Sequence, residues 1–216
     1  MIDKNRLSIV IQGPLNKTSL NNIENYKKYS SNIIISCWEG DDIDVSSFLN
    51  SSAVTLLKNK IPDLEQVKKH YWDQSANHYY QIWSTHSGLC LCNTEYSMKV
   101  RSDEAYSNLD ELLRVLEYES PNDIINIDWV HTATISDHLL LGNTKLLKDS
   151  FSFLANEYLK KNVPEYMSQN SPVEDIISET LVKFSTHKLT FPIVKVADLG
   201  KVLCVWNHTG RIYKNE

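Results

Sequence analysis

The sequence lacks a long apolar run, an excess of basic residues and an abundance of residues that interrupt secondary structure. No hydrophobic stretch approaches the about 20 residues that a membrane-spanning helix needs, so we expect no transmembrane segment. Lys and Arg number 22 against 27 Asp and Glu, for a formal net charge of −5. This balance argues against a nucleic-acid partner, because such proteins usually carry a basic face. Glycine and proline occur only six times each, which favours a compact chain with short loops.

The four cysteines form no C-x-x-C pair, which excludes a zinc ribbon and a thioredoxin-type motif. Three of them lie in apolar stretches, where a small buried thiol is the simplest interpretation. The apolar stretch near the N-terminus is too short for a signal peptide, and it lacks a small-residue cleavage site. We therefore expect a cytoplasmic, reducing location, which still allows peripheral association with the inner face of the membrane.

The residues that are present predict an α/β fold in one domain, residues 1–216. Hydrophobic residues make up 42% and charged residues 23%, as in globular proteins. Buried strands are predicted at 7–11 and 32–38, with a helix at 19–29 between them, and this βαβ unit predicts a parallel sheet. Further strands are expected at about 53–57, 96–102, 123–128, 138–141, 193–196 and 201–205, and helices at 74–92, 109–117, 144–160 and 171–184. The whole pattern is Rossmann-like in its first half and mixed in its second.

The turn Gln12-Gly13-Pro14 follows the first predicted strand. Ligands of open α/β sheets bind beyond the carboxyl ends of the strands, and a glycine lets backbone approach a ligand closely. The alternative is a plain β-to-α turn, because the motif is neither G-x-G-x-x-G nor a P-loop.

The predicted helix at 74–92 contains no Asp, Glu, Lys or Arg. At about 100° per residue, Asn77, Gln81, Ser84 and Gly88 share one face. A solvent-exposed polar face is one interpretation. Exposed helix faces normally carry Lys and Glu, however, so we expect contact with a ligand or with tightly packed backbone.

In the predicted strand at 96–102 and the residues after it, Lys99, Arg101 and Asp103 alternate and therefore project from one face. Buried charges are costly unless they are paired or bind something charged. Two cations and a carboxylate suit a phosphorylated ligand with Mg²⁺ or Mn²⁺, since hard cations prefer oxygen ligands. The alternative is a structural ion pair between Arg101 and Asp103 near an edge of the sheet.

Two further carboxylates lie in the second half of the chain. Asp137 falls between two predicted strands, where a general base can reach a ligand, although a simple turn aspartate is equally compatible. Glu174 occupies the last position of a capping box, and that role alone explains it.

Five short motifs, taken in order, resemble those of the WavE-type lipopolysaccharide synthesis family. They are Gln12-Gly13-Pro14, residues 36–40, Asn77 with residues 80–81 and 84–89, residues 99–103, and Ser136-Asp137 with Gly142. The chain departs from the family pattern in three ways. Tyr80 stands in place of an arginine and His138 in place of a tryptophan, and only one aspartate of a D-x-D motif is present at residues 101–103.

This resemblance implies a GT-A-like, Rossmann-type mixed sheet flanked by helices. It implies a glycosyltransferase that moves a sugar from a phosphate-activated donor, a nucleotide sugar, to a growing bacterial surface polysaccharide such as lipopolysaccharide or capsule. The acceptor would be a glycan or a lipid-linked glycan. Residues 1–105 would form the donor-binding half and residues 106–216 the acceptor and catalytic half.

The implied roles divide between metal, donor and acceptor. Asp103 would bind a divalent cation, Mg²⁺ or Mn²⁺. Asp137 would act as the general base, with Glu174 as the second choice. The donor would be lined by Gln12, Gly13, Pro14, Trp38, Asn77, Gln81, Lys99 and Arg101.

Two rival functions fit the same residues. A metal-dependent phosphoesterase would also use carboxylates at strand ends. A non-catalytic glycan- or nucleotide-binding module would stack sugars on tryptophans.

Overall fold

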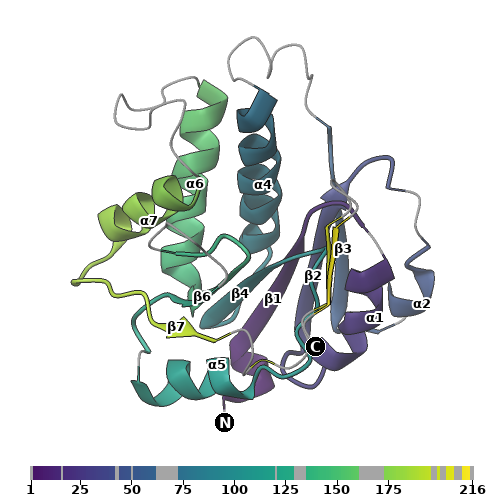
Figure 1. Cartoon of the computed structure of the whole chain (residues 1–216), viewed down its shortest axis with the longest axis horizontal. Helices are drawn as coiled ribbons and strands as arrows, with labels where there is room; N and C mark the ends of the chain where they lie inside the picture. The colour runs from purple at the N-terminus through teal and green to yellow at the C-terminus, as the bar shows by residue number, and fades with distance from the viewer. Residues whose placement is uncertain are drawn as a thin grey trace.

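A seven-stranded mixed sheet forms the centre of the protein, with strand order β3-β2-β1-β4-β6-β5-β7 (Figure 1). The structure is a computed structural model. It describes residues 2–15, 17–41, 44–49, 51–61, 73–119, 121–128, 135–160, 173–195, 199, 203–206 and 211–214.

The first half of the chain builds the parallel part of the sheet. Its strands are β1 (Leu7–Gln12), β2 (Asn32–Trp38), β3 (Val54–Asn59) and β4 (Tyr96–Arg101), and its helices are η1 (Lys4–Arg6), α1 (Lys17–Tyr26), α2 (Ser46–Leu49) and α4 (Asp73–Cys90). Strand β1 pairs in parallel with both β2 and β4, and β2 pairs in parallel with β3. The predicted parallel βαβ unit is therefore confirmed, while the short η1 and α2 were not predicted.

The second half makes the sheet mixed, as predicted. It contains α5 (Asp110–Arg114), a π-helical turn η2 (Val115–Glu119), β5 (Ile125–Ile127), β6 (Leu139–Asn143), α6 (Thr144–Lys160), α7 (Val173–Phe184) and β7 (Ile193–Val194). Strand β6 runs antiparallel to β4 and to β5, and β5 pairs in parallel with β7. A separate antiparallel pair joins β8 (Leu203–Trp206) to β9 (Arg211–Lys214), of which β9 was not predicted.

Helices cover both faces of the sheet, because the side chains of each strand alternate between two apolar clusters. On one face, Ile9 and Ile11 of β1 belong to the cluster that includes residues of α1 and α5. On the other face, Val10 belongs to the cluster that includes residues of α4, α6 and α7. Figure 1 shows α4 and α6 side by side on this second face. Each fully buried Val or Ile contributes about 1.5–3 kcal/mol.

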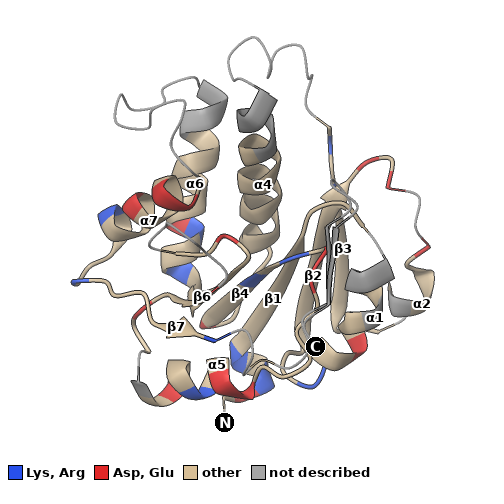
Figure 2. Ribbon diagram, in the orientation of Figure 1, with Lys and Arg blue, Asp and Glu red and all other residues tan. Residues whose placement is uncertain are grey.

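The antiparallel strand β6 brings distant segments together. Val100 of β4 pairs with Leu139 of β6, so the residues before β6 lie beside those that follow β4. The carboxyl ends of β1 and β2 meet β4 at the same edge, because these strands are parallel. Figure 2 shows two blue segments on β4, in the middle of an otherwise mostly tan sheet. These are the lysine and the arginine of that strand.

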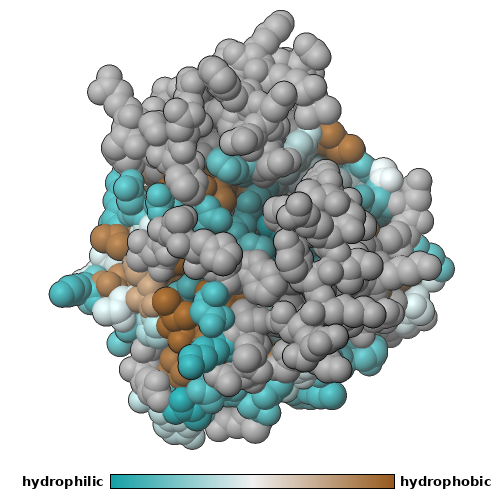
Figure 3. Space-filling view, in the orientation of Figure 1, coloured by the Kyte–Doolittle hydropathy of each residue, from teal (hydrophilic) through white to brown (hydrophobic). Residues whose placement is uncertain are grey.

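The described surface has only scattered apolar side chains. Six large ones are exposed: Leu49, Ile61, Leu91, Tyr118, Val182 and Ile193. On the face shown in Figure 3, small brown patches are separated by teal. None of the described helices combines the length and the apolar character that crossing a bilayer requires.

Candidate functional site

Lys99 lies near the carboxyl end of β4, the middle strand of the sheet. Its side chain is buried, with the residue 1% exposed, and its ammonium group donates a hydrogen bond to the backbone carbonyl of Asp137. Burial lowers the pKa of Lys99 to about 8, although the negative charge of Asp137 opposes that shift. The structure thus places a cation on the central strand, as expected. The hydrogen-bond partner of this cation is a backbone carbonyl in the turn before β6.

The carboxylate of Asp137 is surrounded by donors and cations. Gln81 of α4 donates a hydrogen bond to its Oδ2, and Arg101 Nη1 lies 3.7 Å from the same oxygen. The Nε2 atom of His138 lies 3.5 Å from Oδ1. Burial alone would raise the pKa of Asp137, but Lys99 and the neighbouring cations hold that pKa below its usual range. Asp137 is therefore an ionised group at neutral pH.

Arg101 and Asp103 form the ion pair that the sequence left open as an alternative. Arg101 Nε donates to Oδ1 of Asp103 at 3.0 Å and Nη2 donates to Oδ2 at 2.8 Å. Both side chains keep about a fifth of their surface exposed, at 21% and 20%. Burial lowers the pKa of Arg101, but the bonds and charge of Asp103 outweigh it, so the net shift is upward. The pair lies on the middle strand of the sheet, not near an edge.

Glu174 lies in the first turn of α7 and is half-buried. Burial raises the pKa of Glu174, and the negative charge of Asp137 raises it further. The two carboxyl groups proposed for acid–base chemistry therefore interact, although they are far apart in sequence. The site therefore contains an ionised aspartate and a glutamate that binds a proton more readily than an ordinary glutamate does.

A third pairing was not predicted. Glu104 is buried at 1% exposed and accepts a hydrogen bond from the hydroxyl of Tyr106 at 2.7 Å. Its other oxygen is hydrogen-bonded to Nδ1 of His138. The sequence signal for this contact was weak, because it depends on the antiparallel pairing of β4 with β6.

The turn after β1 packs against the loop after β4. Ser102 donates from its backbone N–H to the carbonyl of Gln12 at 2.8 Å and from its hydroxyl to the carbonyl of Pro14 at 2.6 Å. Gly13 has φ +117°, and a Cβ there would lie 2.8 Å from the hydroxyl of Ser102. The glycine is thus required by its backbone conformation and by the close approach of Ser102.

The uncharged face of α4 lies mainly against the sheet. The backbone carbonyl of Ser84 accepts a hydrogen bond from the hydroxyl of Ser36 at 2.7 Å. The hydroxyl of Ser84 lies 3.3 Å from Oε1 of Gln12, and a Cβ on Gly88 would lie 2.4 Å from Val10. At Ser84 and Gly88 this face packs tightly against side chains of β1 and β2, and the alternative prediction of a ligand contact stays a prediction. Asn77 lies in α4, but its side chain falls outside the described part of the chain.

Trp38 is the last residue of β2, at the carboxyl ends of the parallel strands, and it is buried. Its ring packs edge-on against Tyr80 of α4 at a centroid distance of 4.9 Å. Asp41, which the sequence did not single out, accepts hydrogen bonds from the backbone of Trp38 at 3.0 Å and of Leu15 at 3.1 Å. Asp41 therefore holds the loops after β1 and β2 together.

Metal-ligating side chains do not converge anywhere in the described ranges. Within them, no group of three or more His, Cys, Asp or Glu side chains has the geometry to hold an ion. Asp103 provides one partly exposed carboxylate, and Mg²⁺ often takes only one or two protein carboxylates together with phosphate oxygens. Both oxygens of Asp103 accept hydrogen bonds from Arg101 in this structure, so a cation there would share them with that side chain.

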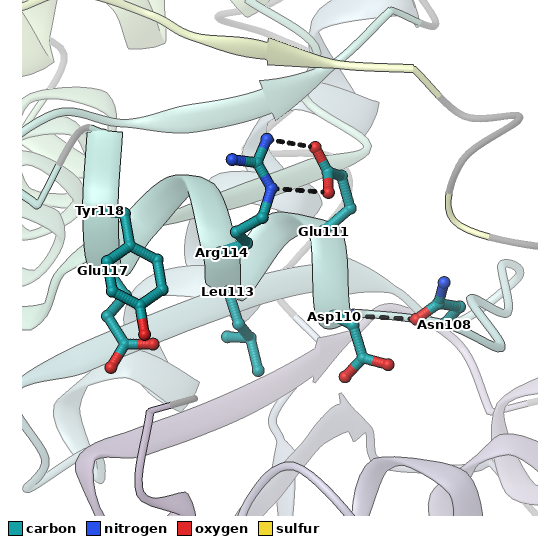
Figure 4. Close-up of a pocket in the computed structure, with 7 residues that line it drawn as sticks. All are labelled: Asn108, Asp110, Glu111, Leu113, Arg114, Glu117 and Tyr118. Carbon is teal, nitrogen blue, oxygen red and sulfur yellow. Dashed lines mark hydrogen bonds and ion pairs between the residues drawn. The ribbon is translucent and has the colours of Figure 1, made fainter.

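A hollow lies elsewhere on the molecule, beside α5 (Figure 4). It has a volume of about 670 Å³ and is lined by Asn108, Asp110, Glu111, Leu113, Arg114, Glu117 and Tyr118. Figure 1 shows α5 near the start of β1. Because β4 runs parallel to β1, the carboxyl end of β4, where the charged cluster lies, is at the opposite end of the sheet. None of the residues predicted for the site lines this hollow.

Three solved structures share the fold at low sequence identity. The 4-diphosphocytidyl-2C-methyl-D-erythritol synthase of Anaerococcus prevotii matches with a TM-score of 0.54 and 11% identity, covering 89% of this chain and 90% of that one. A glycosyltransferase involved in glycosylation of the major capsid of PBCV-1 matches with a TM-score of 0.51 and 9% identity, covering 88% and 83%. The mannosyltransferase PcManGT from Pyrobaculum calidifontis, solved with GDP-Man and Mn²⁺, matches with a TM-score of 0.52 and 11% identity. The match covers 88% of this chain and 56% of the mannosyltransferase, so the chain spans little more than half of that enzyme.

These likenesses confirm the predicted GT-A-like, Rossmann-type mixed sheet flanked by helices. They show the fold alone, because one fold hosts both nucleotidyl and glycosyl transfer. No curated protein sequence is significantly similar to the chain.

The family itself is shown by the sequence. A family model described as WavE lipopolysaccharide synthesis matches residues 7–127, which is more than half of the chain. The match includes the turn after β1 and the charged strand β4, and it ends before Asp137 and Glu174. The chain belongs to the WavE lipopolysaccharide synthesis family.

Proposed function

We propose that this protein is a glycosyltransferase that moves a sugar from a nucleotide-sugar donor to a growing bacterial surface polysaccharide, either lipopolysaccharide or capsule. The observation that carries the proposal is the charged cluster at the carboxyl end of β4. There Lys99 and Arg101 lie beside the buried carboxylate of Asp137, in a family of lipopolysaccharide synthesis. The carboxyl ends of strands are where α/β sheets bind their ligands.

The two cations suit a phosphate leaving group. As the bond between the anomeric carbon and the phosphate oxygen breaks, negative charge grows on the phosphate. Groups aimed at that charge lower the barrier, because they are fixed before the reaction begins. Arg101 is a fifth exposed and so can reach a ligand, while Lys99 contributes its charge from within the sheet.

A divalent cation at Asp103 would complete the charge balance. Lys99 and Arg101 supply two positive charges, but Asp103, Glu104 and Asp137 supply three carboxylates. A diphosphate entering this cluster would meet an excess of negative charge unless a cation came with it. When bound, Mg²⁺ or Mn²⁺ would supply Lewis-acid neutralisation of the phosphate, and Asp103 would hold it. The mannosyltransferase with the same fold was solved with Mn²⁺.

The general base is better assigned to Glu174 than to Asp137. A base must accept a proton from the acceptor hydroxyl, and it works best when its pKa lies near the working pH. The pKa of Glu174 is raised and that of Asp137 is lowered. In this scheme the acceptor oxygen bonds to the anomeric carbon, its proton goes to Glu174, and Asp137 remains ionised as an electrostatic anchor.

The remaining predicted residues would form the walls of the donor pocket. Gln12, Gly13 and Pro14 would approach the donor from the turn after β1, and Trp38, Asn77 and Gln81 would border it from β2 and α4. Residues 1–105 would then bind the donor, and residues 106–216 would supply the base and receive a glycan or a lipid-linked glycan. A lipid-linked acceptor suits a cytoplasmic protein acting at the inner face of the membrane. The three free cysteines in the described chain suit that reducing compartment.

The proposal is tested by incubating the protein with UDP-, GDP-, CMP- and dTDP-sugars and Mn²⁺ and measuring release of the nucleotide. Release that increases when a glycan acceptor is added supports a transferase. Release of inorganic phosphate from phosphate esters, without any dependence on an acceptor, would instead favour a phosphoesterase. Binding without any release would favour a non-catalytic module.

A further inference from the structure

Glu104 is a buried carboxylate that the proposed transfer does not use. It is 1% exposed, although it directly follows Asp103, which is partly open to solvent. Removing a carboxylate from water is costly unless partners replace the lost hydration. The hydrogen-bond partners of Glu104 therefore indicate which function its buried carboxylate serves.

Each oxygen of Glu104 has its own donor. The hydroxyl of Tyr106, itself 1% exposed, donates to Oε2 at 2.7 Å. The Nδ1 atom of His138 is hydrogen-bonded to Oε1, and Arg101 Nε lies 3.8 Å from that oxygen. Both oxygens of this buried carboxylate therefore have a hydrogen-bond partner.

The bond to Glu104 decides where the other ring nitrogen points. The two nitrogens of histidine are distinct, and the partner of one fixes the orientation of the other. With Nδ1 on Glu104, Nε2 of His138 lies 3.5 Å from Oδ1 of Asp137. The result is a continuous array from Tyr106 through Glu104 and His138 to Asp137.

This array spans the two loops that form the site. Glu104 and Tyr106 follow β4, whereas Asp137 and His138 precede the antiparallel strand β6. The Asp137 carboxylate also accepts a hydrogen bond from Gln81 of α4, and its negative charge helps to raise the pKa of Glu174 in α7. The imidazole thus lies between the carboxylates of Glu104 and Asp137 and joins the loop after β4 to the turn before β6.

We infer that Glu104 is a positioning residue, which, held by Tyr106, fixes the imidazole of His138 against Asp137 and thereby sets the geometry of the Asp137–Glu174 pair. The inference rests on the proposed function, since the pair is where the acceptor hydroxyl loses its proton. Glu104 and His138 exchange no proton in this scheme, and Glu104 acts only through the ring that it orients.

The test combines a spectroscopic measurement with kinetics. The ring nitrogens of His138 are observed by long-range ¹⁵N–¹H NMR of histidine-labelled protein, with His138→Gln identifying the signals. The variants are Glu104→Gln and the milder Tyr106→Phe. The control is Glu111→Gln, which makes the same chemical change at a carboxylate paired with Arg114 on α5, outside the cluster. Turnover is measured with the nucleotide sugar that the wild-type protein consumes fastest.

We expect Glu104→Gln to change both ring-nitrogen signals of His138 and to lower kcat by about 10- to 100-fold, as when a partner that orients a functional imidazole is lost. KM for the donor should change by less than about twofold, because phosphate contacts are intact. Tyr106→Phe should shift the same signals less, and Glu111→Gln should change neither signals nor turnover.

Three results would overturn the inference, and they differ from one another. Ring-nitrogen signals that are identical in Glu104→Gln and wild type would show that Glu104 does not orient His138. Altered signals with unchanged kcat would show that the orientation has no part in the transfer. A folded wild-type protein that consumes no donor would refute the proposed function, and the inference with it, even if the His138 signals behaved as expected.

Discussion

The ammonium group of Lys99 donates a hydrogen bond to the backbone carbonyl of Asp137, between the central strand β4 and the turn that leads into β6. The bond joins β4 to this turn, and it puts a buried positive charge within reach of a buried negative one. Replacing either residue therefore disturbs both the position of the turn and the charge balance of the cluster.

Replacing Lys99 with methionine should keep its volume and remove its charge. We expect kcat to fall by about 10²–10³-fold, the loss typical for one group that stabilises developing negative charge. The free energy of unfolding should fall by about 1–3 kcal/mol, because the carbonyl of Asp137 loses its buried partner. Lys145→Met is the matched control, since Lys145 is on the exposed face of α6. Equal losses in the two variants would contradict the role of Lys99.

The pH dependence of stability gives a second measure of the same residue. The pKa of Lys99 falls from 10.5 in the unfolded chain to about 8 when burial removes its ammonium from water. Between these values the unfolded chain holds more protons than the folded one, so the free energy of unfolding rises with pH. Relative to Lys99→Met, the rise should amount to about 3 kcal/mol by pH 10.5. Denaturant titrations from pH 7 to 10.5 measure it, and parallel curves for the two proteins would refute the buried cation.

The two carboxylates should respond differently to neutralisation. Asp137→Asn leaves Lys99 without its counter-charge, and breaking a buried pair in this way costs about 3–5 kcal/mol of stability. Glu174→Gln removes a charge that Asp137 repels, so the melting temperature should stay the same or rise. Its kcat should nevertheless fall by about 10²–10⁴-fold, the usual contribution of a general base.

The pH–rate profile separates the two roles further. Because the pKa of Glu174 is raised, kcat/KM of the wild-type protein should fall as pH drops through that raised value and the base becomes protonated. Glu174→Gln should lose this acidic limb. If Asp137→Asn lost the limb while Glu174→Gln retained it, the base would be Asp137.

The part of the site that follows strand periodicity was predictable. Lys99 and Arg101 share one face of β4 through the period of two, and Asp103 follows in the turn directly after that strand. The helix of residues 144–160 and the strand of residues 32–38 were also predicted with the bounds that the structure gives. The strand contains a run of apolar residues, and the apolar residues of the helix recur at helical spacing.

The contacts between loops were not predictable. The pairing of Glu104 with His138 depends on which strand lies next to β4 and in which direction it runs, and a single sequence does not carry that information. Asp41 was missed because its two hydrogen bonds go to backbone atoms of Leu15 and Trp38, which any residue could supply. The π-helical turn at Val115–Glu119 was missed because its apolar spacing is that of an ordinary helix.

Gly88 tests the packing of α4 on the sheet. A Cβ at this position would lie 2.4 Å from Cγ1 of Val10 and 3.2 Å from Cβ of Ser36. Gly88→Ala should therefore lower the free energy of unfolding by about 1–3 kcal/mol, as overpacking does. Ser87→Ala, at the neighbouring half-buried position, is the control. Stabilisation by Gly88→Ala would mean that α4 does not pack this closely on β1.

The central claim, that the charged end of β4 binds a phosphate-activated donor with a divalent cation, is tested most directly by thermal-shift measurements. UDP, GDP, CMP, dTDP and phosphoribosyl diphosphate are each added with and without Mg²⁺ or Mn²⁺, to the wild-type protein and to Asp103→Asn. A ligand at 100 times its dissociation constant adds about 2.7 kcal/mol, which raises the melting temperature of a protein of this size by about 5–10 °C. We predict such a rise for one ligand, dependent on the cation in the wild-type protein and lost in Asp103→Asn. No rise with any ligand, or a rise that Asp103→Asn retains in full, would contradict the account.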